Sequence, residues 1–298
     1  MRILLIGKDG QLGWELRRTL APLSEIVALG HRELDLADSS AIRAAVRLAQ
    51  PHLIVNAAAY TAVDQAEEER NLAFEINAIA PQVLAEEAKR LGAGLIHYST
   101  DYVFDGSATL PYKEDDVGSP LGIYGASKLA GDTAVMQSGA ASFIFRTSWV
   151  YSSRGRNFFL TVLRLARGEG RLNIVQDQIG APTWSRMIAQ ATSQVMAQCF
   201  SPLHGRDRER HGLGLMMEKR GIYNMSAAGS TSWFGFAGII CARRAPQAEV
   251  VPISSSEYKT SARRPPYSLL SGSKLKTAFG VVLPRWEESL AQMMEELC

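Results

Sequence analysis

A tyrosine and a lysine stand four residues apart in the segment YGASK, at positions 124 and 128. Residues at this spacing lie on one face of a helix, one turn apart. A phenol has a pKa of about 10 and gives up its proton reluctantly at neutral pH. An ammonium nearby stabilises the phenolate, so Lys128 is expected to lower the pKa of Tyr124. Such a pair can protonate a carbonyl oxygen as hydride arrives at the carbon.

The spacing alone is weak evidence, because the chain has nine tyrosines and eight lysines and a chance pairing is easy. The alternative is an ordinary amphipathic tyrosine and a solvated lysine. In the functional interpretation, Gly125, Ala126 and Ser127 leave room for a cofactor lying against the helix. The surrounding sequence has to decide between the two.

Ser99, Thr100 and Asp101 stand at the end of the apolar run GLIHYST (94–100). Open α/β sheets bind their ligands beyond the carboxyl ends of the strands. Thr100 at such a place can donate a hydrogen bond to the same carbonyl oxygen and stabilise its developing charge. The alternative is a strand-end hydroxyl bonded to the backbone.

Three glycines, Gly7, Gly10 and Gly13, punctuate the segment between the first apolar run and the first amphipathic stretch. In a strand–turn–helix they allow a tight turn, close approach of a phosphate and close helix–strand packing. The N–H groups and positive dipole end of the following helix favour a pyrophosphate. The pattern predicts dinucleotide binding, against the alternative of a turn without a ligand.

The second expected strand ends at residues 30–32, which include no carboxylate. An acidic residue there would bond the ribose 2′-hydroxyl and favour NAD, whereas an arginine accommodates a 2′-phosphate. Arg32 therefore favours NADPH, unless it is a solvated loop charge. Asp35 and Leu36 follow closely; Asp35 either reaches the adenine or caps the helix beginning near Ser39.

The elements that position these residues alternate in the first half of the chain. Strands are expected at 2–7, 25–30, 53–59, 94–100 and 142–151, and helices at 11–20, 39–50, from after 59 to near 91, and at 124–137. Short apolar runs without strict alternation are typical of strands buried on both faces. The sequence predicts an α/β fold with a doubly wound, parallel Rossmann sheet over residues 1–151.

The second half, 152–298, is predicted to form mainly a smaller substrate-binding lobe, interleaved with the core. Two segments are expected to return to the core, at about 172–178 and 221–242. The polar stretch 201–212 is interpreted as a surface excursion, and 254–268 as irregular chain. A final amphipathic helix is expected from Arg285 to Leu297.

Composition excludes several classes of protein. A net charge of +2 gives no electrostatic reason to expect nucleic acid as a partner. No apolar run approaches the ~20 residues that span a bilayer, and the N-terminus lacks a signal-peptide pattern. Cys199, Cys241 and Cys298 are too far apart to suggest a disulfide framework or a metal site. We therefore expect a cytoplasmic protein, a monomer or homodimer.

The glycine turn, the Ser-Thr-Asp segment and the Tyr-x-x-x-Lys pair together resemble the extended short-chain dehydrogenase/reductase family. Within it, the chain is similar to the dTDP-4-dehydrorhamnose reductase family nearly from end to end. The motifs that carry this resemblance, in chain order, are GKDGQLGWEL (7–16), VNAAAYTAVDQAE (55–67), YSTDYVFDG (98–106), YGASK (124–128), RTSWVY (146–151), DQIGAPT (177–183) and ARRPPYSLL (262–270).

The resemblance implies reduction of dTDP-4-dehydro-β-L-rhamnose to dTDP-β-L-rhamnose with NADPH, and with NADH as a further coenzyme. This reaction would belong to the synthesis of bacterial surface polysaccharides such as the lipopolysaccharide O-antigen. Tyr124 would donate the proton, Lys128 would hold the nicotinamide ribose, and Thr100 would bond the sugar carbonyl. The remaining implied contacts are Gly10, Gln11, Leu12, Ala58, Ala59 and Tyr60 with the coenzyme, and Thr100, Asp101, Trp149 and Arg264 with the sugar nucleotide. Simple core packing is the alternative for Trp149.

The chain departs from the family pattern in three places. Tyr267 stands where asparagine is expected, WFGFA (233–237) has glycine at a usually larger polar position, and 201–212 resembles an insertion. Some members of the family bind Mg²⁺, but no cluster with metal-ligand spacing is present; Glu15 is better explained as a surface carboxylate near a helix N-terminus.

Two other functions remain open at this point. A dehydratase or epimerase of sugar nucleotides would share the scaffold, although dehydratases carry Asp-Glu where this chain has Asp101 and Tyr102. A regulatory subunit that binds a dinucleotide without catalysis would also share it. Such proteins usually lose the proton donor, which this chain retains.

Overall fold

The structure, a computed structural model, describes residues 1–168, 170–200 and 206–297. Six parallel strands form its central sheet, in the order β10-β5-β4-β3-β1-β2. They are β1 (Arg2–Ile6), β2 (Glu25–Leu29), β3 (Leu53–Asn56), β4 (Gly94–Thr100), β5 (Ala141–Thr147) and β10 (Gly221–Asn224). The order reverses between β1 and β3, as in doubly wound sheets, so the predicted fold class is confirmed.

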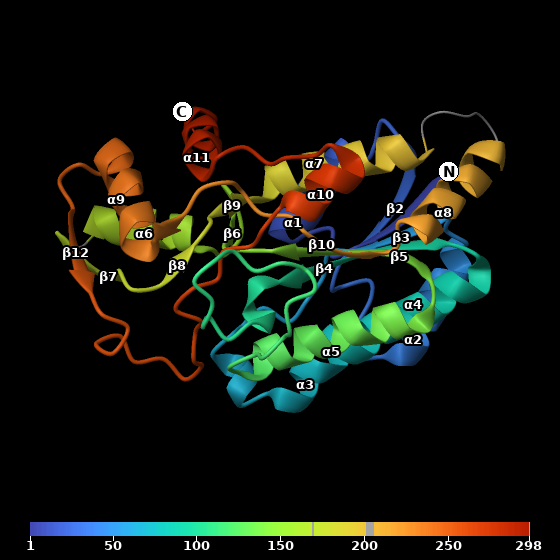
Figure 1. Cartoon of the computed structure of the whole chain (residues 1–298), viewed down its shortest axis with the longest axis horizontal. Coiled ribbons are helices and arrows are strands. Elements are labelled where there is room, and N and C mark those ends of the chain that lie inside the picture. The colour runs from blue at the N-terminus through green and yellow to red at the C-terminus, as the bar shows by residue number, and fades with distance from the viewer. Residues whose placement is uncertain (169, 201–205, 298) are drawn as a thin grey trace.

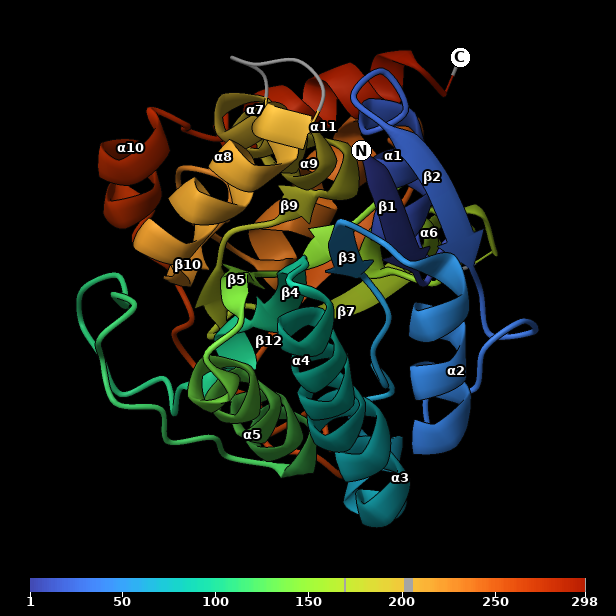
Figure 2. The same ribbon diagram turned by 90° about the vertical axis from the view of Figure 1, so that its right-hand side faces the viewer.

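Helices cover both faces of this sheet (Figure 2). Along β1, Ile3 and Leu5 pack toward α1 and α7, while Leu4 and Ile6 pack toward α2 and α4, because successive side chains of a strand point to opposite faces. The helices are α1 (Gln11–Thr19), α2 (Ser39–Ala49), α3 (Arg70–Phe74), α4 (Ala80–Leu91), α5 (Ile123–Ser138), α6 (Phe158–Gly168), α7 (Ser185–Phe200), α8 (Arg206–Glu218), α9 (Trp233–Arg244), α10 (Ser273–Phe279) and α11 (Trp286–Glu295). None of these is long and apolar enough to cross a membrane.

A smaller lobe lies beyond one end of the sheet and has its own apolar cluster (Figure 1). It consists of α6, α9, α11 and a parallel pair of strands, β7 (Arg171–Val175) and β12 (Glu249–Ile253). Two shorter pairs complete the strands: β6 (Val150–Tyr151) with β9 (Thr183–Trp184), and β8 (Ile179–Gly180) with β11 (Thr231–Ser232).

The second half of the chain is divided differently from the prediction. Residues 172–178 do not return to the central sheet, because β7 pairs with β12 and buries Leu172 in the lobe. In the predicted returning segment 221–242, β10 lies beside β5 in the central sheet, but α9 packs on α6 in the lobe. The helices α7 and α10 contribute to the apolar cluster over the central sheet.

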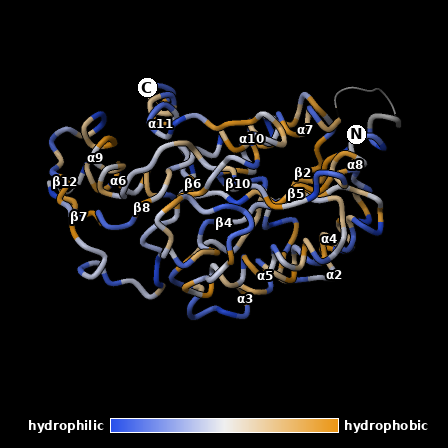
Figure 3. Tube along the Cα trace, viewed as in Figure 1, coloured by the Kyte–Doolittle hydropathy of each residue, from blue (hydrophilic) through white to orange (hydrophobic). Residues whose placement is uncertain are grey.

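Of the stretch 201–212, interpreted as a surface excursion, residues 206–212 form the first half of the helix α8, and residues 201–205 lie outside the described residues. The reason is an apolar anchor further along this helix, because Met216 is buried in the core cluster beside the sheet. Figure 3 shows hydrophobic residues gathered along the central strands and hydrophilic ones on the outer loops.

Close packing fixes α5 against the turn before α4. A side-chain carbon on Gly131 of α5 would lie 2.1 Å from the backbone carbonyl oxygen of Asn77, so any larger residue at 131 forces the two elements apart.

We predict that Gly131→Ala destabilises the fold by about 1–3 kcal/mol, the usual cost of overpacking. Urea unfolding gives the measurement. Gly238→Ala is the matched control, because Gly238 is also helical but has open space around its missing side chain; alanine there should be neutral or stabilise by up to about 1 kcal/mol. Equal unfolding midpoints for the two variants would contradict the packing argument.

Candidate active site

A small cleft opens at the carboxyl edge of the sheet, beside the start of α5. Its walls include Tyr102, Tyr124 and Gly125 from the first half of the chain and Ala262 and Pro265 from the second. Ligands of open α/β sheets bind at this edge. The phenol singled out in the sequence therefore lies on a cleft at the expected place.

Tyr124 is the second residue of α5, and its ring packs edge-on against Tyr102, with 5.5 Å between the ring centroids. Burial raises the pKa of Tyr124 to about 12, and a hydrogen bond with Thr100 acts in the opposite direction. The expected lowering of this pKa is therefore wrong for this structure. A phenol with a raised pKa keeps its proton at neutral pH and is available as a donor.

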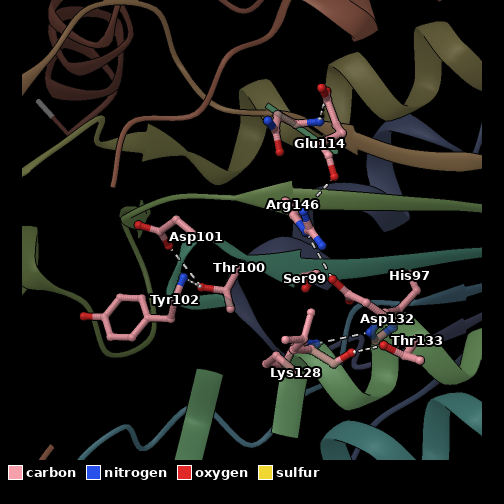
Figure 4. A network of polar contacts seen from close by, with 12 residues as sticks. His97, Ser99, Thr100, Asp101, Tyr102, Glu114, Lys128, Asp132, Thr133 and Arg146 are labelled. Atoms are coloured by element: carbon pink, nitrogen blue, oxygen red, sulfur yellow. Dashed lines mark hydrogen bonds and ion pairs between the residues drawn. The ribbon is translucent and has the colours of Figure 1, made fainter. Parts of the chain in front are cut away.

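Lys128 lies one turn further along α5 and is buried, with 1% of its surface exposed. Its Nζ donates to the Tyr98 carbonyl oxygen at 2.7 Å and lies 3.2 Å from Nε2 of His97 (Figure 4). Burial lowers the pKa of Lys128 to about 8, and the Asp132 carboxylate acts in the opposite direction. The amino group thus contacts β4, and it is not among the causes of the shift at Tyr124.

Two of the small residues between Tyr124 and Lys128, Gly125 and Ser127, lie against backbone carbonyl groups of the protein itself. A side-chain carbon on Gly125 would lie 2.1 Å from the Tyr102 carbonyl oxygen, so this glycine makes room for the turn after β4. The room for a cofactor expected of these residues stays a prediction. Ser127 donates to the Tyr124 carbonyl oxygen at 2.8 Å and accepts from Asn77 Nδ2 at 3.0 Å.

Asn77 is a site residue that sequence reasoning missed. It lies fully buried in a single π-helical turn, Glu75–Ile79, between α3 and α4. Its Oδ1 accepts from the Tyr60 N–H at 2.9 Å and its Nδ2 donates to the Tyr60 carbonyl at 3.0 Å. Isolated π turns often occur at functional sites, but the sequence offers no signal for one beyond a polar residue on an apolar helix face.

Thr100 ends β4, and its hydroxyl donates to Asp101 Oδ1 at 3.0 Å while accepting from the Tyr102 N–H at 3.2 Å. Ser148 donates to the other carboxylate oxygen, Oδ2, at 3.0 Å. Burial raises the pKa of Asp101 to about 6, although hydrogen bonds from Ser268, Ser148 and Thr100 oppose it. Thr100 and Asp101 thus form one connected polar group beside Tyr124.

The glycine turn has the shape that a dinucleotide requires. Gly7 has a φ of +89°, and a side-chain carbon there would lie 2.7 Å from the Ala58 N. A side-chain carbon on Gly13 would lie 2.0 Å from the Gly7 carbonyl oxygen. Gly10 precedes α1 without a side-chain cap, so the N–H groups of the first turn are available to a phosphate. The residues present fit a pyrophosphate.

The other predicted coenzyme contacts surround this turn. The Gln11 side chain accepts from Asn157 Nδ2 at 2.9 Å, which ties α1 to the loop before α6. Leu12 packs against the core. Ala58, Ala59 and Tyr60 follow β3, and burial, with a hydrogen bond to Glu69, raises the pKa of the Tyr60 hydroxyl to about 12.

Beyond β2, Arg32 and Asp35 are exposed and Leu36 is buried. Asp35 does not cap α2: its Oδ1 accepts from the Ala37 N–H at 2.9 Å, whereas Asp38 accepts from two N–H groups of the first turn of α2. Asp38 stands directly before the helix and therefore reaches these groups, as an N-cap residue does.

Carboxylates do approach the end of β2, although residues 30–32 contain none. Glu33 accepts from the Gly30 N–H at 2.8 Å and pairs with Lys8 at 2.5 Å. The Asp9 carboxylate lies so close that a side-chain carbon on Gly30 would meet it at 2.0 Å. The end of β2 thus combines the cations Lys8 and Arg32 with two carboxylates.

Trp149 follows β5 with a φ of +47°, a left-handed conformation that is uncommon for a bulky residue. Its ring stacks on Trp233 with 3.5 Å between centroids and 3° between planes. The indole N–H of Trp233 donates to Gln178 Oε1 at 3.1 Å. Strained residues of this kind cluster at functional sites, and Trp233 is a second residue that sequence reasoning missed.

Arg264 contacts the core through Asp64, with Nη2 to Oδ2 at 2.6 Å and Nη1 to Oδ1 at 3.1 Å. This pairing lowers the pKa of the Asp64 carboxyl. It joins the irregular segment 254–268 to the loop after β3, beside the cleft. Tyr267, at the position that departs from the family pattern, lies with its ring centroid 6.5 Å from that of Tyr112.

The residues present do not form an evident Mg²⁺ site. Glu15 is not the surface carboxylate that the sequence suggested: it is buried, and its Oε2 pairs with Arg186 Nε at 3.2 Å. Within the described ranges, no three or more His, Cys, Asp or Glu side chains gather as a metal site would require. The environment of Glu15 is that of a structural ion pair between α1 and α7.

Comparison with known proteins decides the family. The family model for the RmlD substrate binding domain matches residues 1–298. A dTDP-4-dehydrorhamnose reductase of Burkholderia thailandensis is 45% identical over 100% of this chain and 99% of its own length. The chain belongs to the dTDP-4-dehydrorhamnose reductase family. The resemblance inferred from the sequence motifs is thereby confirmed.

Solved structures of this reductase family agree in fold along the whole chain. The enzyme of Bacillus anthracis, crystallised in complex with NADP, is 36% identical, with a TM-score of 0.87 and 99% coverage of each chain. The Clostridium acetobutylicum enzyme is 33% identical, with a TM-score of 0.89 and coverage of 100% and 99%. Both agree with a reductase on a Rossmann sheet, and the NADP bound to the Bacillus anthracis enzyme supports an NADP-dependent oxidoreductase.

The buried Asp101 predicts a pH dependence of stability. Its folded-state pKa of about 6 lies above the ordinary value of 3.8, so between these values the folded state binds more protons than the unfolded state. Stability from this group must fall as pH rises from about 4 to 6, by at most about 1.4 kcal/mol per unit. We expect Asp101→Asn to remove this component, measured by urea unfolding of both proteins across that range. Parallel pH curves would contradict the raised pKa.

Proposed function

We propose that this chain reduces dTDP-4-dehydro-β-L-rhamnose to dTDP-β-L-rhamnose with NADPH, and that it also accepts NADH. The family that it belongs to supports the reaction. The observation that carries the assignment is Tyr124 on the cleft at the carboxyl edge of the sheet, with Thr100 beside it.

In this proposal Tyr124 protonates the C4 oxygen of the sugar, and its raised pKa keeps the proton on the phenol until charge develops on that oxygen. When bound, the coenzyme supplies the hydride. Thr100 turns its hydroxyl from Asp101 toward the same oxygen and stabilises the developing charge. Lys128, anchored on β4, positions the nicotinamide ribose.

We propose that the smaller lobe, mainly residues 152–298, holds the sugar nucleotide against this edge. Trp149 and its stacked partner Trp233 offer a flat apolar wall, and Asp101 and Arg264 offer polar groups. The Asp64–Arg264 pair keeps the segment 254–268 close to the cleft. Contact of Arg264 with the substrate then requires its guanidinium to serve both partners, for which its five N–H groups suffice.

The removal of one oxygen tests the role of Tyr124. We expect Tyr124→Phe to keep NADPH affinity within about twofold and to lower kcat by a factor of about 10²–10⁴, the usual contribution of a general acid. Fluorescence titration gives the affinity and NADPH consumption gives kcat. Wild-type turnover by the variant would remove Tyr124 from the mechanism.

The choice of coenzyme follows from the charges beyond β2. Arg32 is exposed and can meet a 2′-phosphate, whereas Glu33 and Asp9 can accept from a 2′-hydroxyl. This mixed set supports use of both coenzymes, with NADPH preferred.

Charge removal at position 32 tests this preference. Arg32→Gln should lower kcat/KM for NADPH about tenfold relative to NADH, because one charge-assisted bond is lost. Arg167→Gln, an exposed arginine at the end of α6, is the control. An unchanged ratio of the two kcat/KM values would show that Arg32 does not read the 2′ position.

The alternatives weighed from the sequence have less support. This chain lacks the second carboxylate that a dehydratase uses, since Tyr102 follows Asp101. A non-catalytic subunit would not need the proton donor that this chain has on the cleft. The cytoplasmic location and the monomeric or homodimeric state stay predictions; Cys199 and Cys241 are free and buried, as in a reduced compartment.

A further inference from the structure

The helix that carries Tyr124 begins without a cap of its own. Gly122 directly precedes α5 and has no side chain, and the first turn of α5 contains no acidic residue. The first N–H groups of a helix have no partner within the helix. Because Tyr124 is the second residue of α5, loosening of this first turn displaces its ring directly.

A carboxylate from a distant part of the chain supplies the missing acceptor. Glu67 ends a short 3₁₀ turn, Gln65–Glu67, and its Oε1 accepts from the Ile123 N–H at 2.8 Å. A side-chain carbon on Gly122 would lie 2.5 Å from the same oxygen, so the glycine leaves the space that the carboxylate occupies. The helix dipole also favours a negative charge at a helix N-terminus.

The two carboxylates that follow Glu67 in the chain do not share this contact. Glu69 accepts from the Tyr60 hydroxyl at 2.8 Å, and Glu68 is exposed. Glu67 lines the cleft together with Tyr124. Among these three carboxylates, Glu67 is therefore the one that contacts the helix of the proton donor.

The turn that carries Glu67 is anchored to the opposite wall of the cleft. Asp64 directly precedes this turn, and its Oδ1 accepts from the Ala262 N–H and from Arg264 Nη1, each at 3.1 Å. The Oδ2 atom accepts from Arg264 Nη2 at 2.6 Å. Ala66, between the two carboxylates, is fully buried. The turn thus contacts α5 on one side and the segment 262–264 on the other.

We propose that Glu67 is a positioning residue for the reduction, because its carboxylate holds the first turn of α5 and thereby keeps Tyr124 on the cleft. Asp64 fixes the turn from which Glu67 reaches the helix, so one short turn holds both the proton donor and Arg264 in place. Glu67 acts through the helix backbone and exchanges no proton with the substrate. The inference rests on the proposed function for its meaning, but its first test needs no turnover.

Amide hydrogen exchange, followed by NMR in the full-length protein without ligands, tests the contact. We expect Glu67→Ala to speed exchange of the Ile123 N–H about fivefold or more, the usual effect of losing an N-terminal cap. Glu67→Gln keeps an acceptor oxygen and should stay within about twofold of the wild type. Glu68→Ala, which removes the exposed carboxylate next along the chain, is the matched control and should leave the rate unchanged. Unchanged exchange in Glu67→Ala would overturn the proposal.

Kinetics test whether the contact matters for the reaction. Glu67→Ala should lower kcat about tenfold, because a misplaced proton donor slows the chemical step. The KM for the sugar nucleotide should stay within about twofold, because Asp64 still holds Arg264 by charge-assisted bonds. Glu67→Gln should restore kcat. A role in stability alone would lower the urea midpoint and leave kcat of the folded variant unchanged, and that result would contradict the proposal.

A second variant reaches the same contact from the helix side. Gly122→Ala puts a methyl group where the Glu67 carboxylate lies, so it should speed exchange at Ile123 and lower kcat as Glu67→Ala does. Wild-type values of both in Gly122→Ala would contradict the proposal, including in the case that Glu67→Ala does not fold.

The anchor at Asp64 has its own test. Asp64→Asn replaces one of the two acceptor oxygens that face Arg264. We expect exchange at Ile123 to rise about twofold or more, because a lost bond to a charged group loosens the turn that carries Glu67. No change at Ile123 would contradict the role given to Asp64.

The outcomes separate this inference from the proposed function. If the wild type does not consume NADPH with dTDP-4-dehydro-β-L-rhamnose while exchange at Ile123 responds as expected, the proposed function alone fails. If the wild type is active and folded Glu67→Ala turns over at the wild-type rate, this inference alone fails.

Discussion

The close approach of α5 to the turn after β4 is the constraint on which the site depends. Gly125 allows the Tyr102 backbone to lie where any side chain would stand, and Gly131 does the same for Asn77. This contact places Tyr124 at the cleft and Lys128 beneath it. The desolvation that follows shifts both groups toward their neutral forms, with the phenol protonated and the pKa of the amine lowered.

Buried polar groups are costly unless they are hydrogen-bonded, and this site buries many of them. His97, Lys128, Asp132 and Arg146 lie under the carboxyl edge of the sheet, and each has a partner among the described residues (Figure 4). An apolar core in the same place would contain no side chains that need hydrogen bonds. A hydrogen-bonded network in this position holds side chains in fixed directions.

The sequence predicted the central sheet well because its strands are short apolar runs joined by amphipathic helices. It also located Tyr124, Thr100 and the glycine turn, since each lies beside a strand end or helix start that can be read locally. It misjudged the lobe, where β7 pairs with β12 through contacts distant in the chain. It did not predict α8, because the first half of this helix is charged and contains glycine, and its buried apolar residue, Met216, lies further along the chain.

The electrostatics were the least predictable part. The spacing of Tyr124 and Lys128 is that of an interacting pair, but the direction in which each side chain points depends on tertiary neighbours. Lys128 contacts Tyr98 and His97 because β4 runs directly beneath α5. Asn77, Trp233 and the Asp64–Arg264 pair were likewise invisible, since each depends on partners at least 17 residues away in the chain.

The central claim is that hydride from a nicotinamide coenzyme ends on the carbon whose oxygen Tyr124 protonates. The most direct measurement is the mass and proton spectrum of the sugar nucleotide formed from dTDP-4-dehydro-β-L-rhamnose and NADPH dideuterated at C4 of the nicotinamide. The account predicts one deuterium, at C4 of dTDP-β-L-rhamnose, with one NADP⁺ formed for each product molecule. A product without deuterium at C4, or one formed without net oxidation of the coenzyme, would contradict it.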